Sequence, residues 1–209
     1  MNKEVDEVNK RDKEKYIKWE PPAEGEWKIN SDGAAAGNPV PGGASCIIRD
    51  SNGNMKVASN IPLMNTNSYE AEIQGLKLGL VLAQKMELKK VRCQVDCRSL
   101  MESIRKTRTE RMDTYQEDQL MEIQKMMKEL EILDIEWKPR ETNAVSDQLA
   151  KEATTTAKLI WQGQHQQTFT HNVSFSLPMY DNINIWTTVP NSVGISFKND
   201  QNGVMYLRT

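Results

Sequence analysis

The sequence predicts an α/β fold in which a five-stranded mixed sheet is flanked by helices, followed by a C-terminal extension. Two observations lead to this expectation. Short runs alternate between apolar and polar side chains, which is typical of strands, and longer segments repeat apolar residues at helical spacing. Their order along the chain is three strands, a helix, a strand, two helices, a strand and a helix. Such an order indicates a mixed sheet with helices packed on it.

The five strands are expected in short segments separated by turns and helices. They occupy residues 28–32, 44–50, 56–60, 91–96 and 132–137. The second and third strands are joined at Asn52-Gly53, a pair that readily adopts the positive φ angles of a hairpin turn. In the fourth strand, Val91, Cys93 and Val95 alternate with polar residues, which predicts one apolar face.

Four helices are expected between and after these strands. They occupy residues 67–85, 99–106, 114–130 and 143–158. The first has an apolar stripe, formed by Ile73, Leu76, Leu80 and Ala83, that would pack on the sheet. The last is expected to begin at Asn143, a residue type that caps helix N-termini well.

Three regions differ in composition. Residues 1–18 mix acidic and basic side chains with few apolar ones, which predicts a disordered charged leader. Residues 19–158 contain all the expected elements and form the predicted domain, entered through a Trp- and Pro-rich linker. Residues 159–209 are rich in Asn, Gln and Thr, and two readings stay open for them. They form either a loosely attached tail or a small β unit built from the β-like runs at 172–177 and 193–198.

The length, charge and composition of the chain limit the classes of protein to which it can belong. A chain of 209 residues can contain one core of about 130 to 150 residues plus extensions. Its 27 basic and 29 acidic side chains give a net charge of −2, which disfavours a broadly basic nucleic-acid binder. No secretory signal and no membrane-length apolar run are visible, so an intracellular protein, nuclear or cytoplasmic and not secreted, is expected. Cys46, Cys93 and Cys97 are expected to be reduced thiols.

Two of the predicted strands, which are expected to have similar orientations, each finish in an aspartate. Asp32 and Asp96 each lie on the polar side of their strand at its carboxyl end. If both strands bury their apolar faces on the same side of the sheet, the two carboxylates emerge together. Phosphodiester hydrolysis by two Mg²⁺ ions about 4 Å apart needs such converging carboxylates, since oxygen is the ligand that Mg²⁺ prefers.

The first helix offers two further carboxylates with different expected roles. Glu70 follows Asn67 at the spacing of a capping box and shares its face with polar residues, which predicts a structural role. Glu72 shares its face with Gly75 and Gly79, small residues that let a helix approach a sheet closely. An inward-pointing carboxylate is costly unless it is paired or bound to metal, so Glu72 is the predicted ligand.

Four motifs occur in a fixed order along the chain. Residues 30–43 combine the strand-end aspartate with a Gly-Asn-Pro loop, and residues 70–83 begin Glu-Ala-Glu and end Gly-Leu-Val-Leu-Ala. Residues 89–96 form a strand that ends in Asp. Residues 137–150 read Trp-Lys-Pro-Arg-Glu-Thr-Asn-Ala-Val-Ser-Asp-Gln-Leu-Ala. In these motifs the chain resembles the ribonuclease H family, and in particular its plant reverse-transcriptase-like branch, over residues 19–158.

The resemblance implies a ribonuclease H-like fold and a Mg²⁺-dependent endonuclease that cleaves the RNA strand of RNA–DNA hybrids. It implies two Mg²⁺ ions, with Mn²⁺ as an alternative ion. The implied catalytic and metal-binding residues are Asp32, Glu72, Asp96 and Asp147. The implied contacts to the nucleic-acid backbone are Gly37, Asn38, Asn67, Ser68 and Arg98.

The chain also departs from the family pattern. The loop at 138–142 lacks the His that some relatives use in product release, and His165 and His171 come only after the last helix. Ser68-Tyr69 replaces a frequent Asn pair, which affects the expected contacts to the RNA 2′-hydroxyl. The basic run at 105–111 is either a solvated connection or a ridge that contacts phosphates.

Two other functions remain open at the level of sequence. The same fold could serve as a catalytically weak or inactive module that binds nucleic acid or another partner. A DNA-directed nuclease would share the metal site but need no 2′-hydroxyl contact. The sequence does not determine the oligomeric state, nor whether the chain is a host protein or a fragment of a retroelement.

Overall fold

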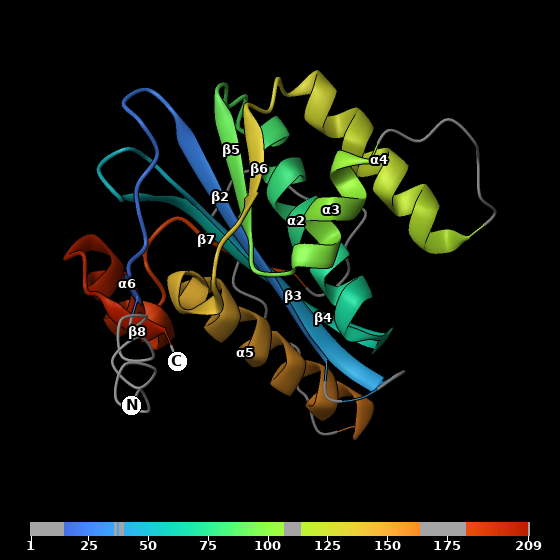
Figure 1. Cartoon of the computed structure of the whole chain (residues 1–209). Coiled ribbons are helices and arrows are strands. Elements are labelled where there is room, and N and C mark those ends of the chain that lie inside the picture. Colours follow the sequence, from blue (N-terminus) through green and yellow to red (C-terminus); the bar gives the residue numbers. More distant parts are fainter. Residues whose placement is uncertain (1–14, 36, 38–39, 107–113, 164–182, 209) are drawn as a thin grey trace, which may run out of the picture.

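Figure 1 shows a computed structural model of the chain, which describes residues 15–35, 37, 40–106, 114–163 and 183–208. The predicted α/β fold is confirmed, because a mixed sheet runs through the centre with helices on both faces. Residues 1–14 of the expected leader lie outside the described residues. So do Asn38, the β-like run at 172–177, and the two histidines.

The central sheet has six described strands in the order β6-β5-β2-β3-β4-β7. β2, β5 and β6 run parallel to one another, whereas β3, β4 and β7 are each antiparallel to the strand before them in this order. The bounds are β2 Trp27–Ala35, β3 Val40–Arg49, β4 Met55–Thr66, β5 Val91–Val95, β6 Asp134–Trp137 and β7 Asn184–Trp186. A separate antiparallel pair joins β1 (Lys15–Ile17) to β8 (Tyr206–Arg208).

The helices divide between the two faces of the sheet. On one face lie α2, α3 and α4, and on the other lies α5, as Figure 1 shows. Their bounds are α2 Ser68–Lys85, α3 Arg98–Arg105, α4 Tyr115–Glu129 and α5 Ala144–Trp161, the last preceded by the 3₁₀ turn η1 (Arg140–Asn143). The 3₁₀ turn η2 (Asn191–Val193) leads into α6 (Gly194–Gln201). The expected apolar stripe of α2 is buried as predicted.

Each face of the sheet has its own hydrophobic core. The larger core lies under α2, α3 and α4 and includes Ile29, Leu76 and Ile123. The smaller core lies under α5 and includes Ile47 and Leu149. Because both faces are covered, β2 is buried along most of its length, and its end can position side chains rigidly.

The prediction of five strands in the central sheet is corrected to six described strands, because the C-terminal extension adds β7. β7 is only three residues long, too short for a clear period in the sequence, and it pairs with the edge strand β4. The β-like run at 193–198 is also corrected, because most of it forms α6 rather than a strand. Val193 and Phe197 are four residues apart, so both reach the smaller core on one side of this helix.

The extension is also tied to the sheet by a buried ion pair. Arg49 Nη1 donates to Asp200 Oδ2 at 2.7 Å, and the two side chains are 1% and 0% exposed. Arg49 Nη2 donates to Asn30 Oδ1 at 2.8 Å, and its guanidinium lies 3.7 Å from the centre of the Trp19 ring. The linker at the start of the predicted domain and the extension after it therefore meet on its central strands β2 and β3.

The start of α5 differs from the prediction. Asn143 was expected to cap this helix, but its side chain makes no capping hydrogen bond. It is buried, and its Nδ2 donates to the Ser31 carbonyl at 2.9 Å. Ser146 Oγ likewise donates to the Asn30 carbonyl at 3.0 Å. These two bonds fix the start of α5 against β2.

Within the described part of the chain, no helix combines the length and apolar character of a membrane span.

Candidate active site

Parallel pairing of β2 and β5 places two aspartates at one end of the sheet. Ser31 lies opposite Val95 in this pairing, and each is followed directly by an aspartate, Asp32 and Asp96. The two strands point the same way, so both carboxylates leave the sheet at the same end. This is the arrangement that the sequence predicted for the two strand-end residues.

Close contact between α2 and β2 brings Glu72 to the same place. A Cβ atom on Gly75 would lie 2.5 Å from the Asp32 carbonyl oxygen, and one on Gly33 would overlap the backbone of Ala71 and Glu72. Only glycine at these positions permits such an approach of helix to strand. Glu72 therefore projects from α2 towards Asp32, as its predicted helical face required.

The three carboxylates form a compact cluster. One ligand oxygen from each of Asp32, Glu72 and Asp96 lies within 4.8 Å of the others. One oxygen of each is also buried without a hydrogen-bond partner among the described residues, namely Asp32 Oδ2, Glu72 Oε2 and Asp96 Oδ1. Buried acceptors without partners are costly unless a cation satisfies them. The oxygen donors match the preference of Mg²⁺ or Mn²⁺, so the cluster fits a divalent metal.

The burial and close approach of the three carboxyl groups raise their pKa values. Burial, followed by the negative charge of Asp96, raises the pKa of Asp32 to about 8. Burial, followed by the charge of Asp32, raises the pKa of Glu72 to about 11. Burial also raises the pKa of Asp96. The protein alone therefore disfavours three charges here, and a bound cation would reverse that preference.

The fourth predicted carboxylate, Asp147, is in a different setting. It lies in the first turn of α5, and its side chain is bound by two cations. Its Oδ1 accepts a hydrogen bond from Arg140 Nε at 2.8 Å, and its Oδ2 accepts one from Lys151 Nζ at 2.5 Å. Its charge still contributes to the raised pKa of Asp32. The structure thus places Asp147 near the cluster but not among the three converging oxygens.

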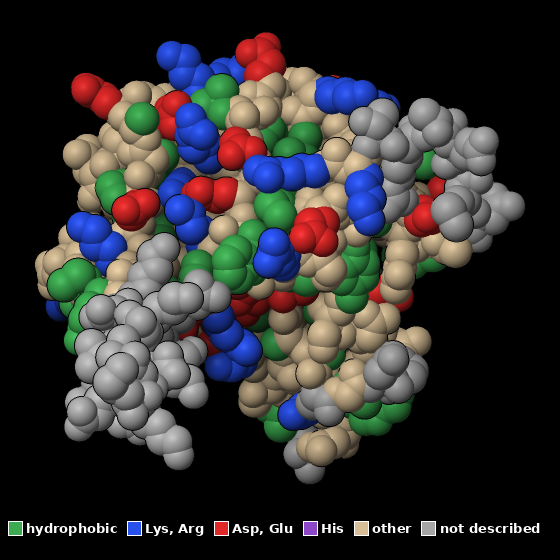
Figure 2. Space-filling view, in the orientation of Figure 1, with side chains coloured by type: hydrophobic (Ala, Val, Ile, Leu, Met, Phe, Trp, Pro, Cys, Tyr) green, Lys and Arg blue, Asp and Glu red, His purple; other side chains and the backbone are tan. Residues whose placement is uncertain are grey.

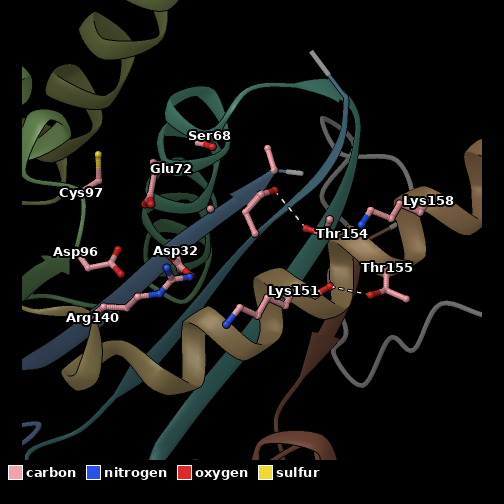
Figure 3. A pocket seen from close by; sticks show the side chains of 13 residues that line it. Asp32, Ser68, Glu72, Asp96, Cys97, Arg140, Lys151, Thr154, Thr155 and Lys158 are labelled. Atoms are coloured by element: carbon pink, nitrogen blue, oxygen red, sulfur yellow. Dashed lines mark hydrogen bonds between the residues drawn. The ribbon is translucent and has the colours of Figure 1, made fainter. Parts of the chain in front are cut away.

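A cleft of about 650 Å³ opens over the cluster. Figure 3 shows Glu72 and Ser68 on α2, Asp32 and Asp96 at the ends of their strands, and Lys151, Thr155 and Lys158 on α5. Arg140 reaches in from η1, the 3₁₀ turn that precedes α5. Figure 2 shows acidic side chains recessed in a hollow of this face, with basic side chains beside them. The cleft therefore has an acidic floor and a basic edge.

The residues predicted to contact the nucleic-acid backbone differ in whether they line this cleft. Ser68 lines it, and the neighbouring Asn67 caps α2 through a capping box with Glu70. Gly37 is exposed beyond the end of β2. Arg98 is 71% exposed, pairs with Glu102 and does not line the cleft. Asn38 lies outside the described residues.

The two basic cleft residues that contact Asp147 were not among the predicted site residues. Arg140 and Lys151 neutralise Asp147, and both line the cleft. For Lys151 the sequence contained a signal, because an acidic residue four positions before a lysine on a helix favours an ion pair. For Arg140 there was none, since its contact depends on how η1 folds back against α5.

Comparison with known proteins places this geometry in a family. The profile of the family described as reverse transcriptase-like matches residues 30–153, which is more than half of the chain. The matched segment contains all four predicted carboxylates. The chain belongs to this reverse transcriptase-like, ribonuclease H-like family. The family match ends before the C-terminal extension, so α6 and β7 are additions to the matched region.

Individual relatives agree with this assignment. A curated Arabidopsis thaliana protein, described as a candidate ribonuclease H protein, is 31% identical over 83 residues, which is 40% of this chain. The match spans only 13% of that relative's length. Among solved structures, LC11-RNase H1 in complex with an RNA/DNA hybrid superposes with a TM-score of 0.58 at 26% identity, covering 63% of this chain and 99% of that one.

A second solved structure supports the fold alone. The N-terminal ribonuclease H domain of a Mycobacterium tuberculosis protein, solved as a fusion with maltose binding protein, has a TM-score of 0.55 at 23% identity. It covers 65% of this chain and 98% of that chain. The ribonuclease H-like fold is therefore shared over about two-thirds of the chain.

The two glutamates at the start of α2 should respond differently to the same substitution. We expect Glu72→Gln to abolish metal-dependent activity while leaving the melting temperature unchanged or higher, because it replaces a carboxyl group whose ionisation the crowded cluster disfavours. Glu70→Gln should keep activity and cost at most ~1 kcal/mol, since a Gln still completes the capping box with Asn67. Nuclease assays and thermal melts of both variants check this. Loss of activity in the Glu70 variant alone would refute the assignment.

Stability without metal should fall as pH rises from about 4 to 8. The folded-state pKa of Asp32 is raised from 3.8 to about 8, so the folded protein holds a proton that the unfolded chain has released. The resulting cost is absent below the unfolded pKa, grows between the two values and is complete above about 8. Each kcal/mol lost lowers Tm by about 2–4 °C for a chain of this size.

Melting curves in EDTA at pH 5 and pH 8 test this directly. Tm should be lower at pH 8, and Mg²⁺ should raise it more at pH 8 than at pH 5. In Asp32→Asn the pH dependence should become shallower without vanishing, because burial also raises the pKa of Glu72 and Asp96. A Tm in EDTA that is higher at pH 8 than at pH 5 would contradict the assigned direction.

Proposed function

We propose that the chain is a divalent-metal-dependent endonuclease that cleaves the RNA strand of RNA–DNA hybrids. The observation that carries this proposal is the cluster of Asp32, Glu72 and Asp96, whose converging oxygens are buried without partners at the floor of an open cleft. A cluster of this kind serves little structural purpose, because the fold bears the cost of its desolvation and repulsion. Membership of a ribonuclease H-like family supports the choice of phosphodiester hydrolysis.

The three clustered carboxylates would hold two Mg²⁺ ions, or Mn²⁺ in their place, with Asp147 as a proposed fourth ligand. When bound, such ions would activate a water molecule and stabilise the leaving 3′ oxygen. Arg140 is paired with Asp147, and its positive charge opposes the rise in the pKa of both Asp32 and Asp96. Arg140 would therefore help to keep these carboxylates ionised and ready to bind metal.

The proposed substrate rests on the cleft and on one relative. Ser68 offers a hydroxyl at the edge of the cleft beside Glu72, where the 2′-hydroxyl of an RNA strand could be bound. The LC11-RNase H1 structure, solved in complex with an RNA/DNA hybrid, has the same fold. Gly37, Asn38, Asn67 and Arg98 remain proposed contacts to the nucleic-acid backbone.

One observation favours a second candidate, a binding module with weak or no catalysis. Asp147 is bound by both Arg140 and Lys151, so it would have to exchange at least one of these partners to bind a metal. If it does not, only three carboxylates are available. Such a protein could still bind nucleic acid in the cleft while hydrolysing it slowly.

A comparison of substrates separates these candidates. The full-length protein is incubated with Mg²⁺ and with equal amounts of an RNA–DNA hybrid, a DNA duplex and an RNA duplex of one sequence. We expect cleavage only of the RNA strand in the hybrid. Cleavage of the DNA duplex would indicate a DNA-directed nuclease, and binding without cleavage of any duplex would favour the binding module.

A further inference from the structure

One face of α5 lies along the cleft and is basic. Lys151, Thr155 and Lys158 follow at spacings of four and three residues, so they form one stripe on this helix, here called the α5 basic face. All three line the same cleft as the carboxylate cluster. Figure 3 shows both lysine side chains on the cleft side of the helix, with Lys151 nearer to Arg140 and Lys158 further along the helix.

The position of this face is fixed by the packing of α5. A Cβ atom on Gly43 of β3 would lie 2.5 Å from both the Ala150 carbonyl oxygen and the Thr154 nitrogen, so helix and sheet are in close contact. Thr154 Oγ1 also donates to the Ala34 carbonyl at 3.2 Å, which links α5 to the end of β2. The α5 basic face is therefore held at a fixed distance from Asp32, which lies on β2, the same strand as Ala34.

The two lysines differ in their partners. Lys151 Nζ is bound to Asp147, so much of its charge is compensated within the protein. Lys158 is exposed and forms no ion pair with any residue that the structure describes. Thr155 is short, and its hydroxyl donates to the Lys151 carbonyl at 3.1 Å, so no bulky side chain separates the two lysines. Among the described residues, Lys158 is thus the lysine of this face whose charge is not compensated by a carboxylate.

We propose that the α5 basic face binds the sugar–phosphate backbone of the nucleic-acid strand that crosses the carboxylate cluster, with Lys158 as the main phosphate contact. This inference rests on the proposed function, and it assigns a binding surface outside the predicted contacts. Lys151 and Lys158 are separated by about 10 Å along the helix at 1.5 Å per residue. One strand rises about 3.4 Å per nucleotide, so the face would follow about three nucleotides beside the cluster.

The test measures how hybrid binding depends on salt. Fluorescence anisotropy of a labelled RNA–DNA hybrid is recorded in EDTA, so that metal-dependent cleavage cannot consume the probe. The salt concentration is varied between roughly 0.05 and 0.3 M, a range in which phosphate contacts dominate binding. Full-length wild-type protein is compared with Lys158→Ala and Lys158→Arg. Lys125→Ala is the matched control, because Lys125 is an exposed lysine on α4, away from the cleft.

We expect Lys158→Ala to weaken binding roughly five- to eightfold at 0.1 M salt. One lost phosphate contact changes the slope of log K against log salt by about 0.7 for single strands and 0.9 for duplexes. Lys158→Arg should keep the wild-type slope, and so should Lys125→Ala. A merely structural role for Lys158 would change stability but leave the slope unaltered.

The outcomes separate this inference from the proposed function. If wild-type protein binds the hybrid, and cleaves it once Mg²⁺ is added, but Lys158→Ala has the wild-type slope, the basic face is not a phosphate contact. If Lys125→Ala reduces the slope equally, binding is diffuse and the inference is wrong. If wild-type protein neither binds the hybrid in EDTA nor cleaves it once Mg²⁺ is added, the proposed function itself fails.

Discussion

Asp32→Asn should abolish cleavage of the hybrid while the protein stays folded and still binds it. The substitution conserves side-chain volume but removes a negative ligand from the centre of the cluster, where the Asp32 oxygen lies within 4.8 Å of those of Glu72 and Asp96. Metal stabilisation of transition-state charge contributes several kcal/mol, so we expect a loss of about a thousandfold or more in turnover. Calorimetry should show weaker Mg²⁺ binding in the same variant.

The control for this substitution is Asp118→Asn. Asp118 is an exposed aspartate in the first turn of α4 and does not line the cleft. Its replacement changes net charge by the same amount and should leave turnover and Mg²⁺ affinity as in the wild type. Unchanged turnover in Asp32→Asn would overturn the assignment of the whole cluster.

Asp200→Ala should destabilise the protein by about 3–5 kcal/mol, because it leaves the buried Arg49 guanidinium without its partner. Burial lowers the pKa of Arg49 and raises that of Asp200, so desolvation outweighs the mutual attraction at both ends of the pair. The pair is therefore costly to break even though it adds little net stability. At about 2–4 °C per kcal/mol, Tm should fall by roughly 6–20 °C.

Two further variants show whether the effect comes from the uncompensated charge. Arg49→Met combined with Asp200→Leu removes both charges and should recover much of the lost stability. Glu129→Ala breaks an exposed ion pair with Lys125 on α4 and should cost at most about 0.5 kcal/mol. A loss in Asp200→Ala no larger than that in Glu129→Ala would show that α6 does not anchor the extension.

The geometry of the cluster could be predicted from sequence to a large extent. Alternation placed Asp32 and Asp96 on the polar sides of their strands, and parallel pairing of β2 and β5 brings them to one end. The small residues Gly75 and Gly79 indicated which face of α2 meets the sheet, and therefore that Glu72 points inward. These signals are local, since each depends on the period of one element and on residue size.

The parts that sequence did not predict depend on contacts between distant segments. The hydrogen bond from Arg140 in η1 to Asp147 was not predicted, because this contact is set by the backbone path rather than by spacing. Asp200 lies in a polar stretch with no visible pattern, yet it reaches Arg49, 151 residues earlier. The run at 193–198 has β-forming residues, but Val193 and Phe197 are buried at helical spacing because the smaller core lies on one side.

Cleavage of a hybrid labelled at the RNA 5′ end, with fragment ends identified chemically, tests the central claim most directly. Full-length wild-type protein at pH 8 is compared in Mg²⁺ and in EDTA. We expect fragments with 5′-phosphate and 3′-hydroxyl ends that form only with Mg²⁺, and an intact DNA strand. A folded protein that binds the hybrid but yields no such fragments with either Mg²⁺ or Mn²⁺ would contradict the central claim, as would cleavage that persists in EDTA.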